Sequence, residues 1–533
     1  MAYGKLEEPK LFNDEQMRQF IADGYVVFKP EVSDEVHQKV REQLQIMEDE
    51  EFNFGNNVLP RVPEMDRILN SPEVRGALTS VLGPGYIDHP HRHSHYIAPE
   101  AEQKTLVQNC HQDSYSPLGQ PRQHYPRFAR IMYYPQDSPV EIGPTHVIPG
   151  TQYHKQLTDE DRHNAIPIAG SAGTVSITHF DIGHAAGVNK INKPRHMIKF
   201  IYTRAEEPRE VSWDCQVSMW KNPSTVEAPH NLDLVWSHIW DWLCGKKNKY
   251  ESFCALDSNT VDKALDAMNA DQLDTRISAM HTLAAQGEIK AIPSLIARLN
   301  SGPSWERVTA IYTLAALGQP AIEPLVTALK DSANDNGGDP LTKFWNENAI
   351  SMDDATHALA AIGSPSLNSL IELLDDSNPW VRINAAFALG EMDSAAAKAV
   401  PALTRCLDDA SHYVVRTAAD ALSTIRQNRE QFMPSLGRLL KVGRPEWQTP
   451  TLRSWSPNDQ VRVNAAMAFT RLGKDAASAE ELLLEKLSDP NGHVATFVLE
   501  ALRRIGTPTA MEGAMDYLMT RRWDEGIIKG RMY

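Results

Sequence analysis

The spacing of hydrophobic and polar positions changes near residue 258. Before that point, short apolar or alternating runs such as 128–134 and 173–178 are separated by Pro and Gly. Runs of this length with such punctuation are typical of β-strands. The stretch 14–23 has the spacing of an amphipathic helix. We therefore expect residues 1–257 to form a mostly β domain with helices at both ends.

After residue 258 the apolar spacing becomes helical and one pattern recurs. In its clearest copies an Arg is followed by Ala three positions later and by Gly eleven positions later; these copies start at Arg276, Arg307 and Arg462. Weaker copies start at Met352, Arg382, Arg416 and Ala495. Successive starts are 30 to 46 residues apart, and most of these intervals suit a pair of helices. The sequence therefore predicts an all-α repeat array.

The repeat resembles a known helical unit. Residues 378–389 read Asn-Pro-Trp-Val-Arg-Ile-Asn-Ala-Ala-Phe-Ala-Leu, which is similar to the D-x-x-x-V-R-x-x-A-A-x-A-L core of short bacterial HEAT repeats. The resemblance covers about 265–525 and implies a solenoid of about seven repeats over residues 258–533. An ordinary helical bundle is the alternative, but a bundle need not repeat an Arg, an Ala pair and a Gly in register.

Two neighbouring side chains in the N-terminal half suggest a metal site. In an extended segment alternate side chains share a face, so His111 and Asp113 could bind one ion. A lone H-x-D pair is weak evidence, but His184 follows in the stretch 180–184 and would complete a set of two His and one carboxylate. This set holds a ferrous ion on one face and leaves the other positions open for a cosubstrate and dioxygen.

Arg195 begins an apolar, strand-like run eleven residues after His184. A guanidinium can bind a carboxylate through two parallel N–H···O bonds, which a lysine cannot reproduce. An arginine one strand beyond the second His could therefore hold the distal carboxylate of 2-oxoglutarate.

The order of these motifs resembles the phytanoyl-CoA dioxygenase (PhyH) family of Fe(II)- and 2-oxoglutarate-dependent oxygenases, from about residue 11 to 204. The resemblance rests on 20–28 as an opening helix and strand, on Cys110-His-Gln-Asp113 as the metal motif, on 141–154 as a strand-turn signature, and on the interval from His184 to Arg195. It implies a double-stranded β-helix (jelly roll) with flanking helices, so the expected fold class is α+β and multidomain.

The resemblance also implies roles for single residues. His111, Asp113 and His184 correspond to the catalytic iron ligands, and Arg195 to the clamp for the far carboxylate of the cosubstrate. The family often has Ser two residues after the second His, where this chain has Ala186. Gln108 or Asn109 could supply the missing hydrogen bond, although either could equally be an ordinary loop residue.

The family chemistry implies Fe(II), 2-oxoglutarate and dioxygen, with hydroxylation of a C–H bond as the default outcome and succinate and CO2 as co-products. The carboxylate at position 113 argues against halogenation, because related halogenases carry Gly or Ala there. Desaturation or ring formation stays open.

Four histidines stand at every second position between His89 and His95. In a strand they would share a face, which would permit a second metal, but Pro90 interrupts the strand. The resemblance places this segment beside the cofactor pocket, so His93 and His95 are candidates for substrate contact. Structural hydrogen bonding is the alternative.

Composition restricts the partners. The chain has 53 Lys and Arg against 69 Asp and Glu, a net charge of −16, and no basic tract, so nucleic acid is not expected. The five cysteines are scattered and form no CxxC pair, which suggests reduced thiols. The sequence contains no run of 18 apolar residues, so no membrane span is expected. We expect a cytoplasmic enzyme with a small-molecule substrate.

The repeats leave two other functions open. Because concave repeat surfaces commonly bind proteins, they could deliver a protein or carrier-bound substrate or mediate self-association. Alternatively, the protein could be a non-catalytic scaffold, although an intact His, Asp, His and Arg set argues against this.

Overall fold

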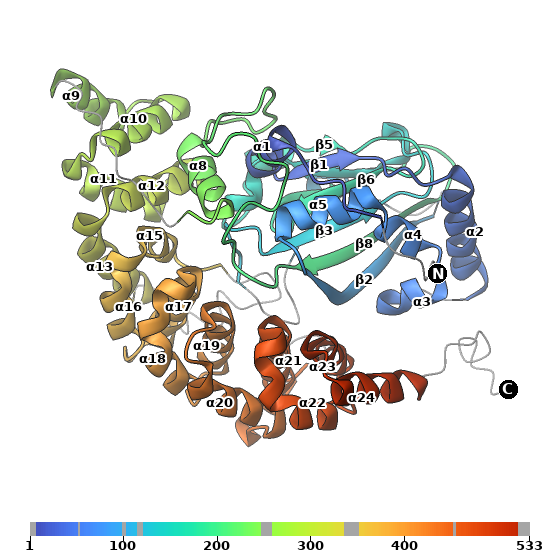
Figure 1. Ribbon diagram of the computed structural model, residues 1–533. Helices are drawn as coiled ribbons and strands as arrows, with labels where there is room; N and C mark the ends of the chain where they lie inside the picture. The colour runs from blue at the N-terminus through green and yellow to red at the C-terminus, as the bar shows by residue number, and fades with distance from the viewer. Residues whose placement is uncertain are drawn as a thin grey trace.

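The computed structural model describes residues 7–51, 54–98, 103–113, 121–246, 258–334, 351–450 and 455–520. An N-terminal β-sheet domain is followed by a curved array of helices that wraps around one side of it (Figure 1). The predicted fold class, a jelly roll followed by a HEAT-type solenoid, is confirmed. In the part of the chain that is described, no helix has both the length and the apolar character needed to span a bilayer.

The N-terminal domain is built from two antiparallel sheets. The larger has the strand order β1-β6-β3-β8-β2 and the smaller the order β5-β4-β7. The strands are β1 (Tyr25–Phe28), β2 (Ile87–Ile97), β3 (Phe128–Tyr133), β4 (Thr145–Ile148), β5 (Ile166–Pro167), β6 (Val175–His179), β7 (Gly183–Ala186) and β8 (Arg195–Thr203). The runs 128–134 and 173–178, which were predicted as strands, correspond to the central strands β3 and β6.

Helices cover the outer face of the larger sheet, where α1 and α5 pack against it (Figure 1). The helix predicted at 14–23 is α1, which begins with a capping box at Asn13 and ends at the left-handed Gly24. The helices of this domain are α1 (Asp14–Asp23), α2 (Asp34–Glu50), α3 (Val58–Arg61), α4 (Met65–Leu69), α5 (Pro72–Leu82), α6 (Leu106–Asn109), α7 (Asp159–His163) and α8 (Asp233–Leu243), with the 3-10 turns η1 (Gly55–Asn57), η2 (Val140–Ile142) and η3 (Thr151–Tyr153).

The solenoid places one helix of each pair on its inner side and one on its outer side (Figure 1). After α9 (Ser258–Ala267), the inner helices are α10 (Leu273–Gln286), α12 (Ser304–Leu317), α15 (Asp354–Ile362), α17 (Pro379–Glu391), α19 (His412–Ile425), α21 (Pro457–Leu472) and α23 (Gly492–Ile505). The outer helices are α11 (Ile292–Ser301), α13 (Ile322–Asn334), α16 (Leu367–Leu373), α18 (Val400–Cys406), α20 (Arg429–Lys441), α22 (Glu480–Lys486) and α24 (Pro508–Met519). Six of the seven predicted repeat starts lie within inner helices, and Met352 lies just before α15.

Short 3-10 turns join the two helices of a pair: η4 (Ile289–Ala291), η5 (Gln319–Ala321), η6 (Ser364–Ser366), η7 (Asp393–Ala399) and η9 (Gly473–Ala479). A further turn, η8 (Pro445–Trp447), follows α20. Trp447 of η8 is buried within the solenoid, where Arg444 lies 4.1 Å above its ring. Trp455 packs on His493 of α23, with the ring centroids 5.0 Å apart. Phe344 and Trp345 lie outside the described residues, as does the predicted domain boundary at 257.

The inner helices contact the β-sheet domain along the whole arc. Trp305 of α12 packs on His154 with the ring centroids 4.3 Å apart, and Gly150, which has a φ of 81°, approaches so closely that a Cβ there would lie 2.6 Å from the Trp305 ring. Further along the arc the contacts are His124 with His357, Arg127 with Glu391, Glu206 with Arg426, His89 with Phe497 and Gly85 with Arg504. The concave face of the solenoid is therefore occupied by the chain's own N-terminal domain.

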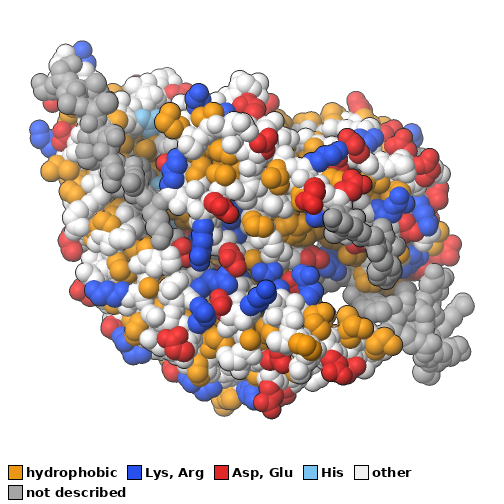
Figure 2. Space-filling view, viewed as in Figure 1, with side chains coloured by type: hydrophobic (Ala, Val, Ile, Leu, Met, Phe, Trp, Pro, Cys, Tyr) orange, Lys and Arg blue, Asp and Glu red, His pale blue; other side chains and the backbone are white. Residues whose placement is uncertain are grey.

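Helix α8 lies between α1 of the sheet domain and α12 of the solenoid. Two of its tryptophans, Trp236 and Trp240, are buried, and Trp240 packs on Trp213 with the ring centroids 5.0 Å apart. On the face in Figure 2, Lys and Arg side chains gather along the seam between the two domains. Two arginines of the solenoid reach the sheet domain, Arg426 at Glu206 and Arg504 at the carbonyl of Gly85.

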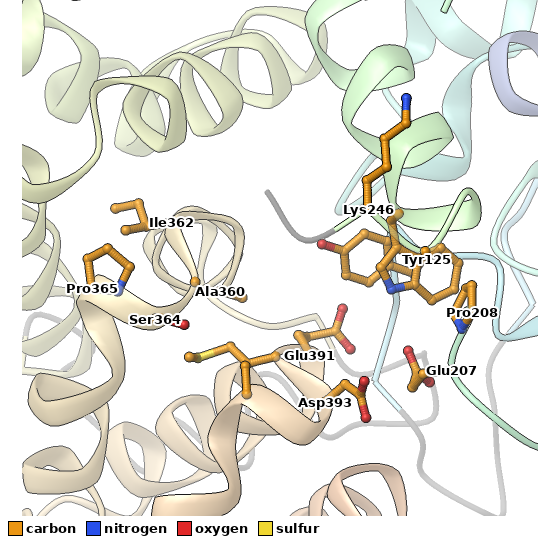
Figure 3. Close-up of a pocket in the computed structure, with 15 residues that line it drawn as sticks. Tyr125, Glu207, Pro208, Lys246, Ala360, Ile362, Ser364, Pro365, Glu391 and Asp393 are labelled. Carbon is orange, nitrogen blue, oxygen red and sulfur yellow. The ribbon is translucent and has the colours of Figure 1, made fainter. Parts of the chain in front are cut away.

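A cavity of about 250 Å³ lies at this junction (Figure 3). Tyr125 and Trp242, stacked 4.4 Å apart, line it on the sheet-domain side, and Ala360, Ile362 and Pro365 line it on the solenoid side. Arg127 forms ion pairs with Glu207 and with Glu391, both of which line the cavity, so one buried arginine joins the two domains.

Candidate active site

The backbone places His111 beside His184. The two residues form an antiparallel bridge at the edge of the smaller sheet, in which each N–H donates to the carbonyl of the other at 2.9 and 2.8 Å. Their ring centroids are 4.5 Å apart. Asp113, two residues on, directs its carboxylate at both rings, and one ligand atom from each of the three residues lies within 4.8 Å of the others.

Hydrogen bonds orient both imidazoles. Nδ1 of His111 donates to the carbonyl of Asn109 at 2.7 Å, and Nδ1 of His184 donates to the carbonyl of Ile182 at 3.0 Å. The Nε2 atoms then carry the lone pairs and lie 3.6 and 3.8 Å from the carboxylate of Asp113. A second hydrogen bond that fixes the tautomer in this way is typical of metal-binding histidines.

Two buried cations converge on the same carboxylate, and neither was predicted from the sequence. Nη2 of Arg130 lies 2.8 Å and Nζ of Lys199 lies 3.1 Å from Oδ2 of Asp113. Burial by itself would raise the pKa of Asp113, but Arg130 and Lys199 hold it well below its usual value. Burial and the charge of Arg130 lower the pKa of His184, which keeps its ring neutral. Asp113 and His184 therefore hold the ionisation states that a metal needs.

A signal for these cations was present in the sequence. Arg130 and Lys199 stand inside the apolar strands β3 and β8, and a charge in such a strand is costly unless it is paired. What the sequence could not supply was the partner, because Asp113 lies on a different segment.

Arg195 is the first residue of β8 and is only 1% exposed. Nη1 donates to the carbonyl of Gly143, whereas Nε has no hydrogen-bond partner among the described residues. Gly143 has a φ of 69°, and a Cβ there would lie 2.5 Å from the carbonyl of Gly187, so only Gly allows this turn. A buried guanidinium with unused donors can accept an anionic ligand.

The other predicted residues have different surroundings. Gln108 completes a capping box with Thr105 at the start of α6, and Nδ2 of Asn109 donates to the carbonyl of Ala186 at 3.0 Å. Both side chains thus stabilise the metal-binding segment. His93 and His95 lie on β2 opposite Lys199 and Met197 of β8. Burial and the charge of Lys199 lower the pKa of His95 to about 2.

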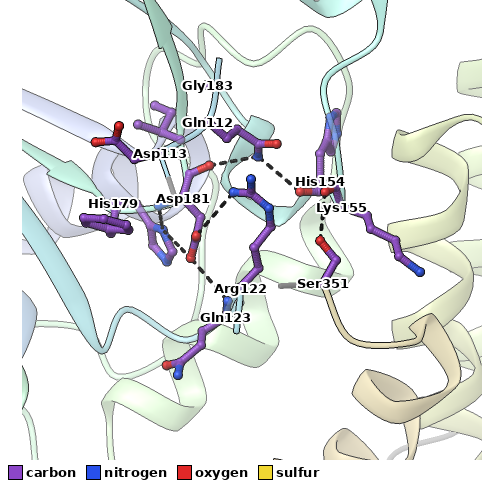
Figure 4. A network of polar contacts seen from close by, with 12 residues as sticks. Gln112, Asp113, Arg122, Gln123, His154, Lys155, His179, Asp181, Gly183 and Ser351 are labelled. Atoms are coloured by element: carbon purple, nitrogen blue, oxygen red, sulfur yellow. Dashed lines mark hydrogen bonds and ion pairs between the residues drawn. The ribbon is translucent and has the colours of Figure 1, made fainter. Parts of the chain in front are cut away.

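A polar network holds the segment that carries Asp113 (Figure 4). Nε2 of Gln112 donates to the carbonyls of Thr151, His154 and Asp181 at 3.2, 3.1 and 2.9 Å. Next to His154, the carbonyl of Lys155 accepts a hydrogen bond from Ser351 at the solenoid. The segment is thus tied to the smaller sheet and, through the 151–155 turn, to the solenoid.

The donor set fits a ferrous ion. Two neutral imidazoles and one ionised carboxylate are the ligands of the facial sites that bind Fe(II), 2-oxoglutarate and dioxygen. The unused donors of Arg195 lie in the same domain, at the start of the strand that also carries Lys199. One domain thus contains three residues that could hold a metal and a buried guanidinium.

Comparison with known proteins gives the same picture for the two halves of the chain. Residues 13–197 match the model of the phytanoyl-CoA dioxygenase (PhyH) family. Residues 353–442 match HEAT repeats, and residues 306–331 match the PBS lyase HEAT-like repeat. The cofactors of a PhyH oxygenase are Fe(II), 2-oxoglutarate and dioxygen. No curated protein matches the chain significantly.

Among solved structures, the chain is similar to EctD from S. alaskensis, described with 2-oxoglutarate and 5-hydroxyectoine, at 17% identity and a TM-score of 0.31, over 46% of this chain and 89% of that one. It is also similar to the α-ketoglutarate-dependent carbocyclase SnoK from nogalamycin biosynthesis, at 19% identity and a TM-score of 0.30, over 38% of this chain and 88% of that one. A third is AviO1 from Streptomyces viridochromogenes Tue57, at 16% identity and a TM-score of 0.29, over 38% and 96% of the two chains.

Proposed function

We propose that this chain, which carries a phytanoyl-CoA dioxygenase (PhyH) domain followed by HEAT repeats, hydroxylates a C–H bond of a small-molecule substrate with succinate and CO2 as co-products. The observation that carries the proposal is the convergence of His111, Asp113 and His184 on one point of a domain that also buries Arg195. Iron, when bound, supplies the activation of dioxygen and the oxidation of the cosubstrate.

The chain's own residues bind and orient in this scheme. The Nε2 atoms of His111 and His184 and the carboxylate of Asp113 hold the metal, and Arg130 keeps that carboxylate ionised and fixed. Arg195 binds the distal carboxylate of 2-oxoglutarate, and its burial removes the competition of water for that bond. The side-chain amide of Asn109 donates to the carbonyl of Ala186. In this position it holds the backbone and does not replace the hydroxyl of the Ser that the family often has at residue 186.

The surroundings of the solenoid favour a small molecule over a protein substrate. The inner helices, which would form the concave recruiting surface, already pack on the chain's own oxygenase domain through residues such as Trp305, His357 and Phe497. A role as a non-catalytic scaffold is disfavoured by the intact metal triad and the orientation of both imidazoles. The solenoid is then a structural partner of the oxygenase domain.

The test is release of succinate from 2-oxoglutarate by the purified protein with Fe(II). Slow release is expected even without the substrate, because uncoupled turnover needs only the cofactor site. His111→Ala and His184→Ala should abolish it, since each removes one of three ligands. His163→Ala is the matched control, because this exposed ring bonds to the carbonyl of Asp159 and is not one of the three grouped residues. Wild-type rates in either ligand variant would show that the ligand assignment is wrong.

A further inference from the structure

The side-chain amide of Gln112 connects three segments of the sheet domain. Its Nε2 donates to three backbone carbonyls, those of Thr151 at 3.2 Å, His154 at 3.1 Å and Asp181 at 2.9 Å (Figure 4). An amide nitrogen carries two hydrogens, so one hydrogen is shared between two of these carbonyls. Because all three neighbours are acceptors, they also decide which end of the amide is the nitrogen.

The turn 150–155 is bonded to both segments that carry metal ligands. Two of the carbonyls that Gln112 reaches belong to this turn. Oγ1 of Thr151 in the same turn accepts a hydrogen bond from the N–H of Gly183 at 3.0 Å, and Gly183 is the residue before His184. A displacement of the turn would therefore displace the chain beside both histidine ligands.

The backbone bridge between His111 and His184 does not by itself place Asp113. The bridge pairs the two histidines, whereas Asp113 lies two residues beyond His111, with Gln112 between them. The hydrogen bonds of Gln112 thus fix the backbone just before Asp113. Residues that orient metal ligands contribute to metal affinity, because they hold the ligand atoms in position before the ion binds.

The solenoid contacts this turn at two places. The ring of Trp305 in α12 packs on that of His154 with the centroids 4.3 Å apart, and a Cβ at Gly150 would lie 2.6 Å from the same indole. Oγ of Ser351, just before α15, donates to the carbonyl of Lys155 at 3.1 Å (Figure 4). Two parts of the solenoid therefore hold the turn in place.

These contacts form a continuous path from the solenoid to the metal ligands. Resting on the proposed function, we propose that the solenoid sets the metal affinity of the oxygenase site by holding the turn 150–155, and that Gln112 is the positioning residue through which the turn acts on Asp113. The solenoid then takes part in the function of the site, although none of the three grouped residues belongs to it.

The test measures Co(II) binding to the full-length protein in the absence of 2-oxoglutarate. Co(II) is the probe because its visible absorption reports both binding and coordination geometry. Gln112→Met keeps a side chain of similar length but removes both donors, so it should weaken Co(II) binding by about tenfold and change the absorption spectrum. Thermal unfolding of the metal-free protein shows that each variant is folded before it is titrated.

Two substitutions in the solenoid test its part. Trp305→Leu and Ser351→Ala each remove one contact with the turn, and each should weaken Co(II) binding by roughly two- to tenfold. Arg504→Gln is the matched control for Ser351→Ala, because both side chains donate a hydrogen bond from the solenoid to a backbone carbonyl of the sheet domain. Arg504 reaches Gly85, which lies outside the turn and outside the ligand segments, so this variant should bind Co(II) as the wild type does.

A combined variant separates this path from general destabilisation. If the solenoid acts through Gln112, Ser351→Ala should weaken Co(II) binding less in the Gln112→Met protein than in the wild type. Ser351→Ala removes only one hydroxyl, so this arm holds even where Trp305→Leu prevents folding. Equal losses from Ser351→Ala in the two backgrounds would show that no such path exists.

The inference is also overturned by wild-type Co(II) affinity in Gln112→Met, or by equal losses in Ser351→Ala and Arg504→Gln. Either result leaves the proposed function standing, provided that His184→Ala abolishes Co(II) binding. Co(II) binding that His184→Ala leaves unchanged would refute the ligand assignment, and with it both the proposed function and this inference.

Discussion

Single buried cations organise the candidate site. Arg130 and Lys199 keep Asp113 ionised and hold it in place, and Arg195 is a third buried cation. The hydrogen-bond acceptors of the three cations differ. Arg130 and Lys199 donate to the carboxylate of Asp113, whereas Nε of Arg195 is a buried donor without a partner among the described residues. In the proposed function, this difference separates the residues that support the metal centre from Arg195, which would bind the diacid.

Arg195→Gln should therefore weaken 2-oxoglutarate binding by about 1.5 to 3 kcal/mol, the usual contribution of a charge-assisted hydrogen bond. Metal binding should persist, because no described contact joins Arg195 to the triad. Calorimetric titration of the metal-loaded protein without oxygen measures both affinities. Arg92→Gln is the control, since Arg92 also lies on the β2 and β8 sheet but pairs with Asp88. An unchanged 2-oxoglutarate affinity in Arg195→Gln would assign the clamp to another residue.

At the scale of the helical repeat, the recurring Arg links each unit to the next. Arg276 pairs with Glu306 and Arg307 with Asp354, and both acids belong to the next inner helix. Arg382 pairs with Asp409 and Arg462 with Asp489, and these acids lie in the turn that leads into the next inner helix. In the fifth unit Arg416 instead reaches Gln460 and Asn464 of α21. The position that identified the repeat in the sequence is thus a contact between neighbouring units.

Arg382→Ala should lower the free energy of unfolding by about 1 to 3 kcal/mol, because Arg382 donates to both oxygens of Asp409 at 2.8 and 2.9 Å in a largely buried pair. Arg405→Ala is the matched control in the same solenoid. Its pair with Asp375 is 3.4 Å long and more than 60% exposed on both sides, so the expected loss is below about 1 kcal/mol. Urea unfolding of both variants measures the difference. Equal losses would show that the repeat Arg does not hold successive units together.

For the whole molecule, the interface between oxygenase and solenoid contains a buried group of histidines. His124 stacks on His357 of α15 with the ring centroids 4.1 Å apart and bonds to the hydroxyl of Tyr312 of α12 at 3.0 Å. His238 of α8 bonds to the hydroxyl of Tyr125 at 2.8 Å. Burial lowers the pKa of His124 to about 4 and that of His238 to about 3, so the folded protein holds both rings neutral.

The protein should accordingly lose stability on acidification. A histidine in the unfolded chain has a pKa near 6.5. Below that pH the unfolded chain binds protons at His124 and His238, whereas burial keeps both rings unprotonated in the folded chain. Stability should fall as the pH decreases from about 6.5 to about 4, the folded pKa of His124, by about 1.4 kcal/mol for each unit of pKa depression. Thermal unfolding between pH 7.5 and 4.5 measures this slope. His124→Gln should flatten it, and an equally steep slope in that variant would exclude His124 as a source.

The sequence by itself determined the two-part architecture. The strand-like spacing of 128–134 and the recurring Arg are local patterns that can be recognised without the tertiary structure. It also identified the residues that converge as a triad, since His111, Asp113 and His184 occur in family order. Only the tertiary structure decided that Arg130 and Lys199 share the carboxylate of Asp113 and that the solenoid's concave face is filled by the chain's own oxygenase domain. The physical reason is that a buried charge and a packed surface are defined by their partners, and those partners come from distant segments whose approach no local pattern encodes.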